Sequence, residues 1–388
     1  MKRTNIFRLV PTKEQERRLF RLADNCSRMY NEVNHKRRIS FFSGKFDWDT
    51  DEFYHRCKKL IGSATAQQII KKNNEAWKSF WALLKKWKMG KIEEKPKPPR
   101  YWKDRETGKR PLKILIRCDN YRLEDKILKL PFRLEIRWRG KNRWKGKQGR
   151  LEIVYDKLSK KWYAFMPVEV KPLHQPIGEK KAYVDLGVKV PIMAYTDEEI
   201  FGYRANSMLS DWWYWTHKIA KHQSTLKQAN NKSTSKRLKY YYRIRQRRFR
   251  DNVNKIVRDF VERCWSKGVL EIVCGDLRDI RNSANFSRRN NSIIHNFWSV
   301  GHMVRRIEEA AEEHGIKVTK VNERGTSSIC PRCGSRRHVR SKRRFKCSDC
   351  GLEAHRDAVG CVNIGLAHKC AEAINGAVAR PSFLTIEV

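Results

Sequence analysis

Two pairs of cysteines near the C-terminal end constrain this chain more than any other feature. Cys330 pairs with Cys333 and Cys347 with Cys350, each with two residues between, and thirteen residues separate the pairs. Four thiolates in this arrangement are the ligand set of a closed, structural zinc site. The interval is slightly shorter than the ~15–20 residues usual in a zinc ribbon. The sequence predicts a small Zn²⁺-dependent insertion at about 328–353.

The alternative of a catalytic zinc is disfavoured, because the segment offers neither an open coordination position nor an evident general base. The arginines and lysines between the two cysteine pairs fit either phosphate contacts or a solvated basic loop. The zinc is therefore expected to be structural.

The charge of the chain points to a polyanionic partner. Lys and Arg number 86 against 42 Asp and Glu, which gives a formal net charge of +44. Such an excess resists compaction unless a polyanion neutralises part of it. A nucleic acid is the natural partner, since each phosphate contact releases counterions. The 13 Trp and 13 Tyr offer stacking faces for bases, although most are expected in packed cores.

The chain carries no sign of a membrane or secretory destination. No apolar run approaches the ~20 residues that span a bilayer, and the N-terminus lacks the apolar stretch of a signal peptide. The 11 cysteines include the four paired ones and seven scattered ones. This usage is typical of a cytoplasmic protein with one metal site and buried thiols.

The first half of the chain reads as a β-rich module with a helical insertion. Residues 3–10 alternate like a strand, and Thr12 is a plausible N-cap for a helix. Helical spacing runs from Leu19 to Tyr30 and again over 64–89. We expect a β-rich module of residues 1–15 and 95–176, with a helical segment at 16–94. Strand-like runs occur at 113–117, 127–130, 133–138, 150–155 and 161–170.

The second half, residues 177–388, has a different pattern. Three strands, the first at 181–188, precede long basic helices, and further strands and helices alternate to the end. The order βββ-α-β-α-β-α is that of the ribonuclease-H-like fold, in which catalytic groups lie at strand ends and on the final helix. The predicted class is α+β and multidomain. The later elements are expected at 190–195, 199–204, 211–229, 233–266, 270–274, 297–314, 316–321 and 356–375.

Two acids are candidate ligands of catalytic metals. Nucleases of that fold use carboxylates around two divalent ions about 4 Å apart, and Mg²⁺ is the expected ion. Asp185 lies in an apolar strand, where an unpaired acid is costly; alternatively it caps a turn. Asp357 opens the last helix, where it either reaches the same centre or only complements the helix dipole.

A third acid belongs at the end of the fourth strand, which holds Gly275 instead. The next residue, Asp276, would point to the opposite face of a regular strand. Glu323 follows the fifth strand, and neighbouring strands lie ~4.8 Å apart, within reach of a glutamate. We therefore predict that Glu323 replaces the missing acid. The alternative is an ordinary surface glutamate beside a damaged centre.

Motifs along nearly the whole chain resemble those of the TnpB family, the transposon-encoded RNA-guided nucleases related to type V CRISPR effectors and Fanzor proteins. The motifs of the C-terminal half are specific, and the N-terminal ones are weak alone. The residues that carry the resemblance are Phe7–Thr12, Ala64–Gln68, Val184–Gly187, Gly275–Leu277, Thr326–Ser327, His355–Asp357 and Asn363–Ile364.

The resemblance implies a RuvC-like nuclease domain at 177–388 that contains the zinc ribbon, a β-rich wedge module and a helical recognition lobe. It implies a guide RNA from the transposon end, a double-stranded DNA target beside a short adjacent motif, two catalytic Mg²⁺ ions and a place in the prokaryotic cytosol or nucleoid. Contacts to RNA or heteroduplex phosphates are expected from Lys236, Arg237, Arg243, Arg245, Arg247, Arg248 and Arg250.

The chain departs from the family pattern at two places. Gly275 stands where the family usually has Glu, and Val359–Gly360 stands where Asn-Ala is commoner. Some relatives carry the Glu at the position of Glu323, and others have lost their acids and act as RNA-guided DNA-binding repressors. The alternatives to an active nuclease are therefore a nuclease-inactive RNA-guided regulator and a guide-independent DNA-binding protein.

Overall fold

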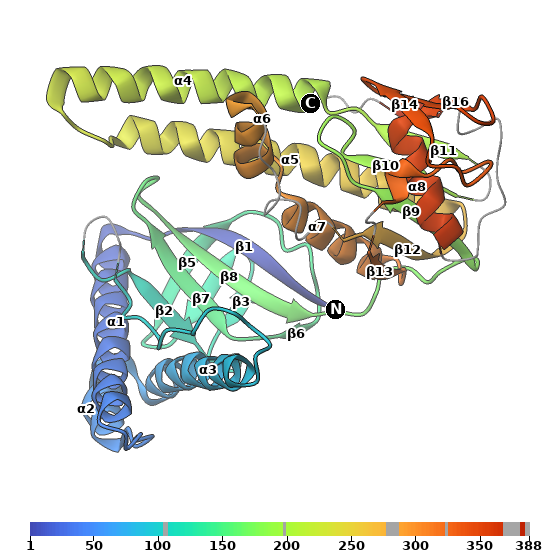
Figure 1. The fold of residues 1–388 in the computed structure, drawn as a ribbon. Helices are drawn as coiled ribbons and strands as arrows, with labels where there is room; N and C mark the ends of the chain where they lie inside the picture. The colour runs from blue at the N-terminus through green and yellow to red at the C-terminus, as the bar shows by residue number, and fades with distance from the viewer. Residues whose placement is uncertain (104–107, 197–198, 277–286, 323–324, 368–380, 385–388) are drawn as a thin grey trace. The chain divides into compact units, whose positions relative to one another are not determined.

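The computed structural model describes all 388 residues except 104–107, 197–198, 277–286, 323–324, 368–380 and 385–388. Contacts divide the chain into two compact units, Met1–Lys171 and Pro172–Val388 (Figure 1). Each unit is described by itself.

The helices of the first unit follow its first strand directly. After β1 (Lys2–Val10) come α1 (Lys13–Phe42), α2 (Asp51–Ile61) and α3 (Ser63–Lys88). Thr12 is confirmed as the N-cap of α1, since its hydroxyl accepts from the Gln15 N–H and the Gln15 side chain accepts from the Thr12 N–H. The short α2 was not predicted, although its buried residues repeat every fourth position, at Phe53, Cys57 and Ile61.

The strands of the first unit form one sheet in the order β2-β7-β8-β1-β5-β4-β3, with β6 paired to β8. The N-terminal strand lies between β8 and β5, antiparallel to both, so the prediction that it completes the β-rich module is confirmed. The two shortest strands, β3 and β6, were not predicted. The bounds are β2 (Lys113–Ile116), β3 (Arg122–Glu124), β4 (Ile127–Leu130), β5 (Leu134–Arg139), β6 (Lys147–Gln148), β7 (Leu151–Asp156) and β8 (Lys161–Glu169).

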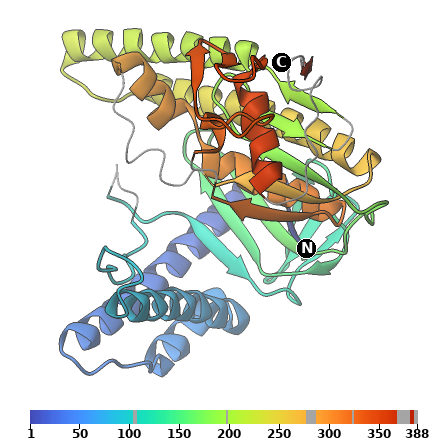
Figure 2. The same cartoon turned by 45° about the vertical axis from the view of Figure 1, so that its right-hand side comes forward.

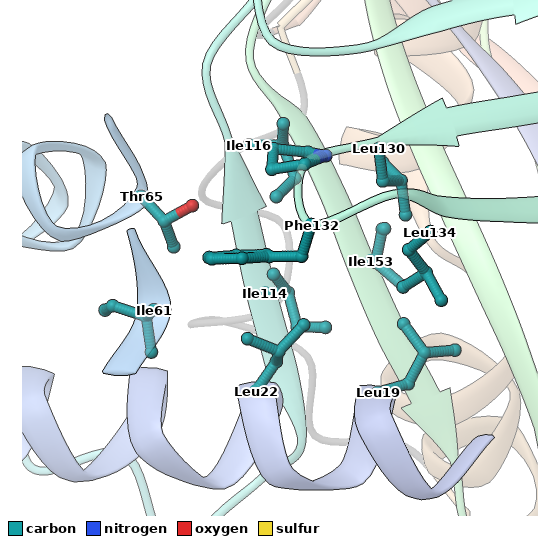
Figure 3. A pocket seen from close by; sticks show the side chains of 11 residues that line it. Leu19, Leu22, Ile61, Thr65, Ile114, Ile116, Leu130, Phe132, Leu134 and Ile153 are labelled. Carbon is teal, nitrogen blue, oxygen red and sulfur yellow. The ribbon is translucent and has the colours of Figure 1, made fainter. Parts of the chain in front are cut away.

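Packing of α1 on this sheet leaves a small apolar pocket (Figure 3). Leu19 and Leu22 of α1 face Ile114 of β2 across it. Phe132 lies over the pocket from the turn between β4 and β5, with a backbone φ of +65°. Its ring approaches Gly62, where an added Cβ would lie 3.0 Å from the Phe132 Cζ. Gly62 itself has φ +82°, so the glycine suits both the backbone and the close approach.

The second unit is built on a sheet in the order β13-β12-β9-β10-β11-β17. Strands β9, β12 and β13 run parallel, whereas β10 is antiparallel to β9 and β11. The bounds are β9 (Lys180–Asp185), β10 (Ile192–Tyr195), β11 (Ile200–Tyr203), β12 (Val269–Gly275), β13 (Lys317–Val321) and β17 (Ser382–Leu384).

Helices cover both faces of this sheet (Figure 1, Figure 2). The hairpin of α4 (Asn206–Asn230) and α5 (Lys236–Ser266) packs with α7 (Val300–Glu313) on one face. The last described helix, α8 (Arg356–Ala367), packs with the cysteine segment on the other. Alternate strand residues supply the two cores, as in Val184 on the α5 face and Tyr183 on the α8 face. A short helix α6 (Arg288–Ser292) and a π-helical turn (Ile293–Phe297) precede α7.

The order of the elements in the second unit agrees with the predicted order βββ-α-β-α-β-α. The predicted last helix, 356–375, is described as far as Ala367, and the rest falls outside the described residues. The cysteine segment forms its own antiparallel sheet of β14 (His338–Ser341), β15 (Arg344–Cys347) and β16 (Glu353–His355). Among the described residues, no helix combines the length and the apolar character that a membrane span requires.

Candidate active site and metal centre

Asp185 lies at the carboxyl end of β9, beside a position in the neighbouring strand β12 that has no side chain. Val184 pairs with Cys274, so the residue that follows on β12, Gly275, stands next to Asp185. Gly275 in turn pairs with Val321, the last residue of β13. Residues side by side on parallel strands point to the same face. The edge therefore presents one carboxylate, one position without a side chain and one valine in a row.

Helix α8 packs directly on Asp185. A Cβ added to Gly360 would lie 2.7 Å from the Asp185 Oδ2 and 3.2 Å from its Cγ. Gly360 is three positions after Asp357, which places both on one side of the helix, a turn apart. The pKa of the fully buried Cys361 is raised mainly by burial and further by the charges of Asp185 and Asp357. Both acids therefore act on the same turn of α8.

The Asp357 carboxylate is 6% exposed and has a strong cationic partner. The Arg343 Nη1 donates to its Oδ1 at 2.7 Å and to its Oδ2 at 2.5 Å. Arg343 belongs to the turn between β14 and β15, and its carbonyl accepts from the Arg356 N–H at 2.8 Å. A guanidinium from the cysteine segment thus compensates the buried charge at the start of α8.

A second contact fixes the same segment to α8. The Asn363 side chain is 6% exposed, and its Nδ2 donates to the carbonyls of Thr326 at 2.6 Å and Ile329 at 2.7 Å. These carbonyls belong to the chain that leads into Cys330. Asn363 therefore anchors the entrance of the cysteine segment, which gives a physical role to two of the family motifs.

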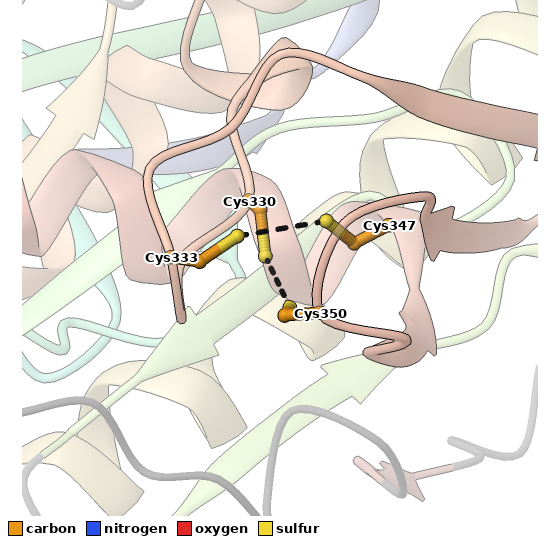
Figure 4. Close-up of side chains that lie close together, drawn as sticks. All are labelled: Cys330, Cys333, Cys347 and Cys350. Carbon is orange, nitrogen blue, oxygen red and sulfur yellow. Dashed lines mark hydrogen bonds between the residues drawn. The ribbon is translucent and has the colours of Figure 1, made fainter.

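The four paired cysteines lie together (Figure 4). Their sulfur atoms all fall within 4.8 Å of one another, with Cys330 3.5 Å from Cys350 and Cys333 3.6 Å from Cys347. Four converging thiols from two turns are the arrangement of a closed tetrahedral zinc site. The predicted ligand set is therefore assembled and can hold a metal ion.

The surroundings shift the pKa values of these thiols in opposite directions. Burial raises the pKa of Cys330 to about 12. The pKa of Cys347 is lowered to about 7, chiefly because its sulfur accepts a backbone hydrogen bond from Cys350. A bound cation would remove this difference, because metal coordination deprotonates thiols outright.

The seven basic residues predicted on α5 fall on two sides of the helix. Spacings of seven, four and three residues place one group on a common side. In the other group, Arg248 donates to the Asp211 carboxylate at 2.7 Å and Arg245 donates to the Thr216 hydroxyl at 3.0 Å. Arg237 bonds the Tyr241 hydroxyl at 2.7 Å. The first group is Lys236, Arg243, Arg247 and Arg250.

One predicted metal ligand is not described by the structure, and two residues that were not predicted contact the candidate acids. Glu323 lies outside the described residues. Asp276 follows β12, and its N–H donates to the Val321 carbonyl at 2.7 Å. The additional residues are Arg343 and Gly360. The departure of Gly360 from the commoner family residue was the one signal in the sequence that could have drawn attention to it.

Comparisons with known proteins place the chain in a family. Residues 165–281 match the family model described as a probable transposase, and residues 301–364 match the Cas12f1-like TNB domain. A TnpB-like protein, ORF457 of Acidianus two-tailed virus, is 33% identical over 365 residues, covering 85% of this chain and 79% of that protein.

Two Cas12f1 proteins are also similar to this chain, one in sequence and one in fold. A CRISPR-associated endodeoxyribonuclease Cas12f1 of Sulfoacidibacillus thermotolerans is 28% identical over 240 residues, covering 55% of this chain and 52% of that protein. The fold is similar to that in a solved Cas12f1–sgRNA–target DNA complex, with a TM-score of 0.57 over 92% of this chain and 83% of that chain at 13% identity. On the identity and coverage shared with the viral protein, this chain belongs to the TnpB family.

Proposed function

We propose that this protein is an RNA-guided DNA endonuclease that hydrolyses phosphodiester bonds in target DNA beside a short adjacent motif. The observation that carries the proposal is the contact of Asp185 with α8 one turn from Asp357. Sequence-distant carboxylates gathered at a sheet edge suit a RuvC-like centre of the ribonuclease-H-like fold. The kinship to Cas12f1 endonucleases supports the same activity.

The donor set fits divalent magnesium. Mg²⁺ prefers carboxylate oxygens, and a nearly buried Asp357 that needs a cationic partner suits such an ion. Asp185 and Asp357 would hold the catalytic ions, and Glu323 would supply the third carboxylate across the space left by Gly275. Two Mg²⁺ ions held by these carboxylates would supply an activated water and charge stabilisation at the leaving oxygen.

The protein's own residues would prepare this chemistry. Gly275 adds no side chain between Asp185 and Val321, and a carboxylate from beyond β13 would take the role of the missing acid. Arg343 neutralises Asp357 when no divalent ion is present. The zinc ribbon would position Arg343 beside α8, because Asn363 of α8 bonds the Thr326 and Ile329 carbonyls at the start of the ribbon.

The proposed partners are a guide RNA derived from the transposon end and double-stranded target DNA, in the prokaryotic cytosol or nucleoid. Base pairing would read the target, and the protein would hold the heteroduplex through its backbone. The β-rich module, 1–15 and 95–176, would act as the wedge, and the helical segment, 16–94, as the recognition lobe. The similar Cas12f1 structure is a complex with sgRNA and target DNA.

Plasmid cleavage tests the proposal. The protein is co-expressed with its native flanking DNA, purified with bound RNA and given Mg²⁺ and a plasmid with a guide-matched target beside randomised sequence. We expect linear product that is lost in Asp185→Ala and in Glu323→Ala, while both variants still bind the target. Asp276→Ala is the matched control and should cut normally. Wild-type cutting by Glu323→Ala would refute the Glu323 assignment, and loss of cutting in Asp276→Ala would then give that role to Asp276.

Gly275 favours a second candidate, a nuclease-inactive RNA-guided DNA-binding regulator, because the usual acid is absent there. In the same assay, tight RNA-dependent binding without cleavage would establish this function. Specific binding that survives removal of the RNA would instead indicate a guide-independent DNA-binding protein.

A further inference from the structure

A small pocket lies in the second unit where β11 ends and α4 begins. Arg204 comes from the end of β11, Ser207 from the first turn of α4, and Asn252 and Lys255 from α5. Tyrosine and aliphatic side chains close the remainder. None of these residues belongs to the centre formed by Asp185 and Asp357, so the pocket calls for its own account.

The N-terminus of α4 borders this pocket through Ser207 and Met208. Its cap residue, Ala205, gives no side-chain hydrogen bond, and the first turn contains no acid. The first backbone bond of the helix runs from the Leu209 N–H to the Ala205 carbonyl at 2.8 Å. The N–H groups of Asn206, Ser207 and Met208 have no acceptor within the helix, and the macrodipole favours negative charge at this end. A 25-residue helix develops this dipole fully.

A second observation is independent of the helix end. The Asn252 side chain lines the pocket and is only 4% exposed, yet its Nδ2 has no hydrogen-bond partner among the described residues. A buried amide donor without an acceptor costs about 1–3 kcal/mol. A ligand with acceptor oxygens would remove this cost.

The charges around the pocket have the matching sign. Arg204 and Lys255 are both exposed at its rim. The nearby acids already have partners: Asp251 pairs with Lys255 at 3.6 Å, and Asp259 accepts from the Tyr203 hydroxyl at 2.6 Å. Helix-end N–H groups, the Asn252 amide and the Arg204 guanidinium supply donors suited to an oxyanion, and Lys255 adds a cation that already pairs with Asp251.

We propose that this pocket binds a backbone phosphate of a nucleic acid. The choice of nucleic acid rests on the proposed function, and the anion class rests on the pocket. Strand β11 runs parallel to β9, since both are antiparallel to β10, so the pocket and Asp185 share one edge of the sheet. The pocket lies on the α5 face, where Met208 and Ile256 pack, whereas Asp185 points to the α8 face, towards Gly360. A nucleic acid bound at the pocket would therefore pass round this edge to reach the carboxylates.

Two substitutions in the full-length protein test the proposal. Ser207→Asp places a carboxylate at the pocket, where it complements the helix dipole and repels phosphate, so the melting temperature should not fall. Asn252→Leu removes the unpartnered donor at similar volume and should also leave the fold intact. Gly301→Asp is the matched control, because α7 likewise begins without a side-chain cap bond or a first-turn acid, and a Cβ at Gly301 meets nothing within 4 Å.

Binding is measured by fluorescence anisotropy with labelled single-stranded RNA, single-stranded DNA and RNA–DNA heteroduplex of about 20 nucleotides, over a range of KCl concentrations. We expect both pocket variants to bind about 10-fold more weakly to whichever probe occupies the pocket. The slope of log Kd against log salt should fall by about 1, whereas Gly301→Asp should match wild type.

Wild-type affinities and slopes for all three probes in both folded variants would overturn the phosphate pocket. The plasmid assay is read separately. If wild-type protein fails to cut but the pocket variants still lose affinity, the pocket stands and the nuclease proposal fails. If wild type cuts and the pocket variants bind and cut like wild type, the nuclease proposal stands and the pocket is refuted.

Discussion

Gly360 illustrates how one missing methyl group can matter at the candidate centre. The Asp185 Oδ2 lies where a Cβ on Gly360 would approach it to 2.7 Å. In the interior of a helix, glycine costs about 1 kcal/mol relative to alanine. This position therefore trades helix stability for room beside a carboxylate.

Gly360→Ala should consequently stabilise α8 but push the Asp185 carboxylate out of place. We expect target cleavage to fall about 10- to 100-fold, because displacements near 1 Å at reacting groups have effects of this size. A weaker Mg²⁺ response should accompany the loss, measured as the Mg²⁺ concentration for half-maximal cutting and, independently, as Mn²⁺ binding by electron paramagnetic resonance.

Gly301→Ala on α7 is the control for the helix-propensity effect, since a Cβ there meets nothing within 4 Å. It should raise the melting temperature and leave cleavage and Mn²⁺ binding unchanged. Equal cleavage and ion binding in Gly360→Ala and wild type would mean that Asp185 has no need of this space.

At the scale of one element, α5 separates two kinds of basic residue. The side towards α4 holds cations that are already engaged, such as Arg248 with Asp211 at 2.7 Å. Burial also lowers the pKa of Arg245. On the opposite side, Lys236, Arg247 and Arg250 are exposed. On this outer side, Lys236, Arg247 and Arg250 suit phosphates better than Arg245 and Arg248, which Thr216 and Asp211 already hold.

Charge reversal on the outer side should therefore weaken nucleic-acid binding. The double variant Arg247→Glu, Arg250→Glu is expected to reduce the slope of log Kd against log salt by about 2, one for each lost phosphate contact. Arg248→Gln, the control, breaks an ion pair within the protein and should leave this slope unchanged. An equal slope change in the control and the double variant would contradict the two-sided assignment.

At the scale of the whole molecule, the two units carry separate hydrophobic cores. The first unit has one cluster, around Phe7, Leu19 and Trp162, and the second has one on each face of its sheet. The cysteine cluster belongs entirely to the second unit and adds Cys330 and Cys347 to the core under α8. Loss of the metal should be felt there.

Cys330→Ser combined with Cys333→Ser should abolish zinc binding and destabilise the second unit selectively. A structural site couples metal binding to folding, so its loss removes stability from the unit that contains it. Zinc content is measured by atomic absorption. Unfolding is followed by calorimetry and by the fluorescence of single tryptophans retained in one unit or the other. Normal zinc content in the variant would refute the ribbon, and an equal shift of both units would refute their independence.

Much of this organisation could be predicted because it is local in the chain. The Thr12 cap, the strand runs and the two cysteine pairs are patterns within a few residues, and all of them are present in the structure. Strands β3 and β6 escaped prediction, since stretches of two or three residues carry little periodicity. Helix α2 was missed although its buried residues repeat every fourth position.

The sequence by itself determined the zinc ligand set, the order of the elements and the candidacy of Asp185 and Asp357, because residue type and spacing suffice for these. Tertiary structure alone decided which residues serve those acids. Arg343 reaches Asp357 only through the fold of the ribbon, and Gly360 meets Asp185 only because α8 packs on β9. Such contacts join residues far apart in the chain, and no local pattern encodes the packing that brings them together.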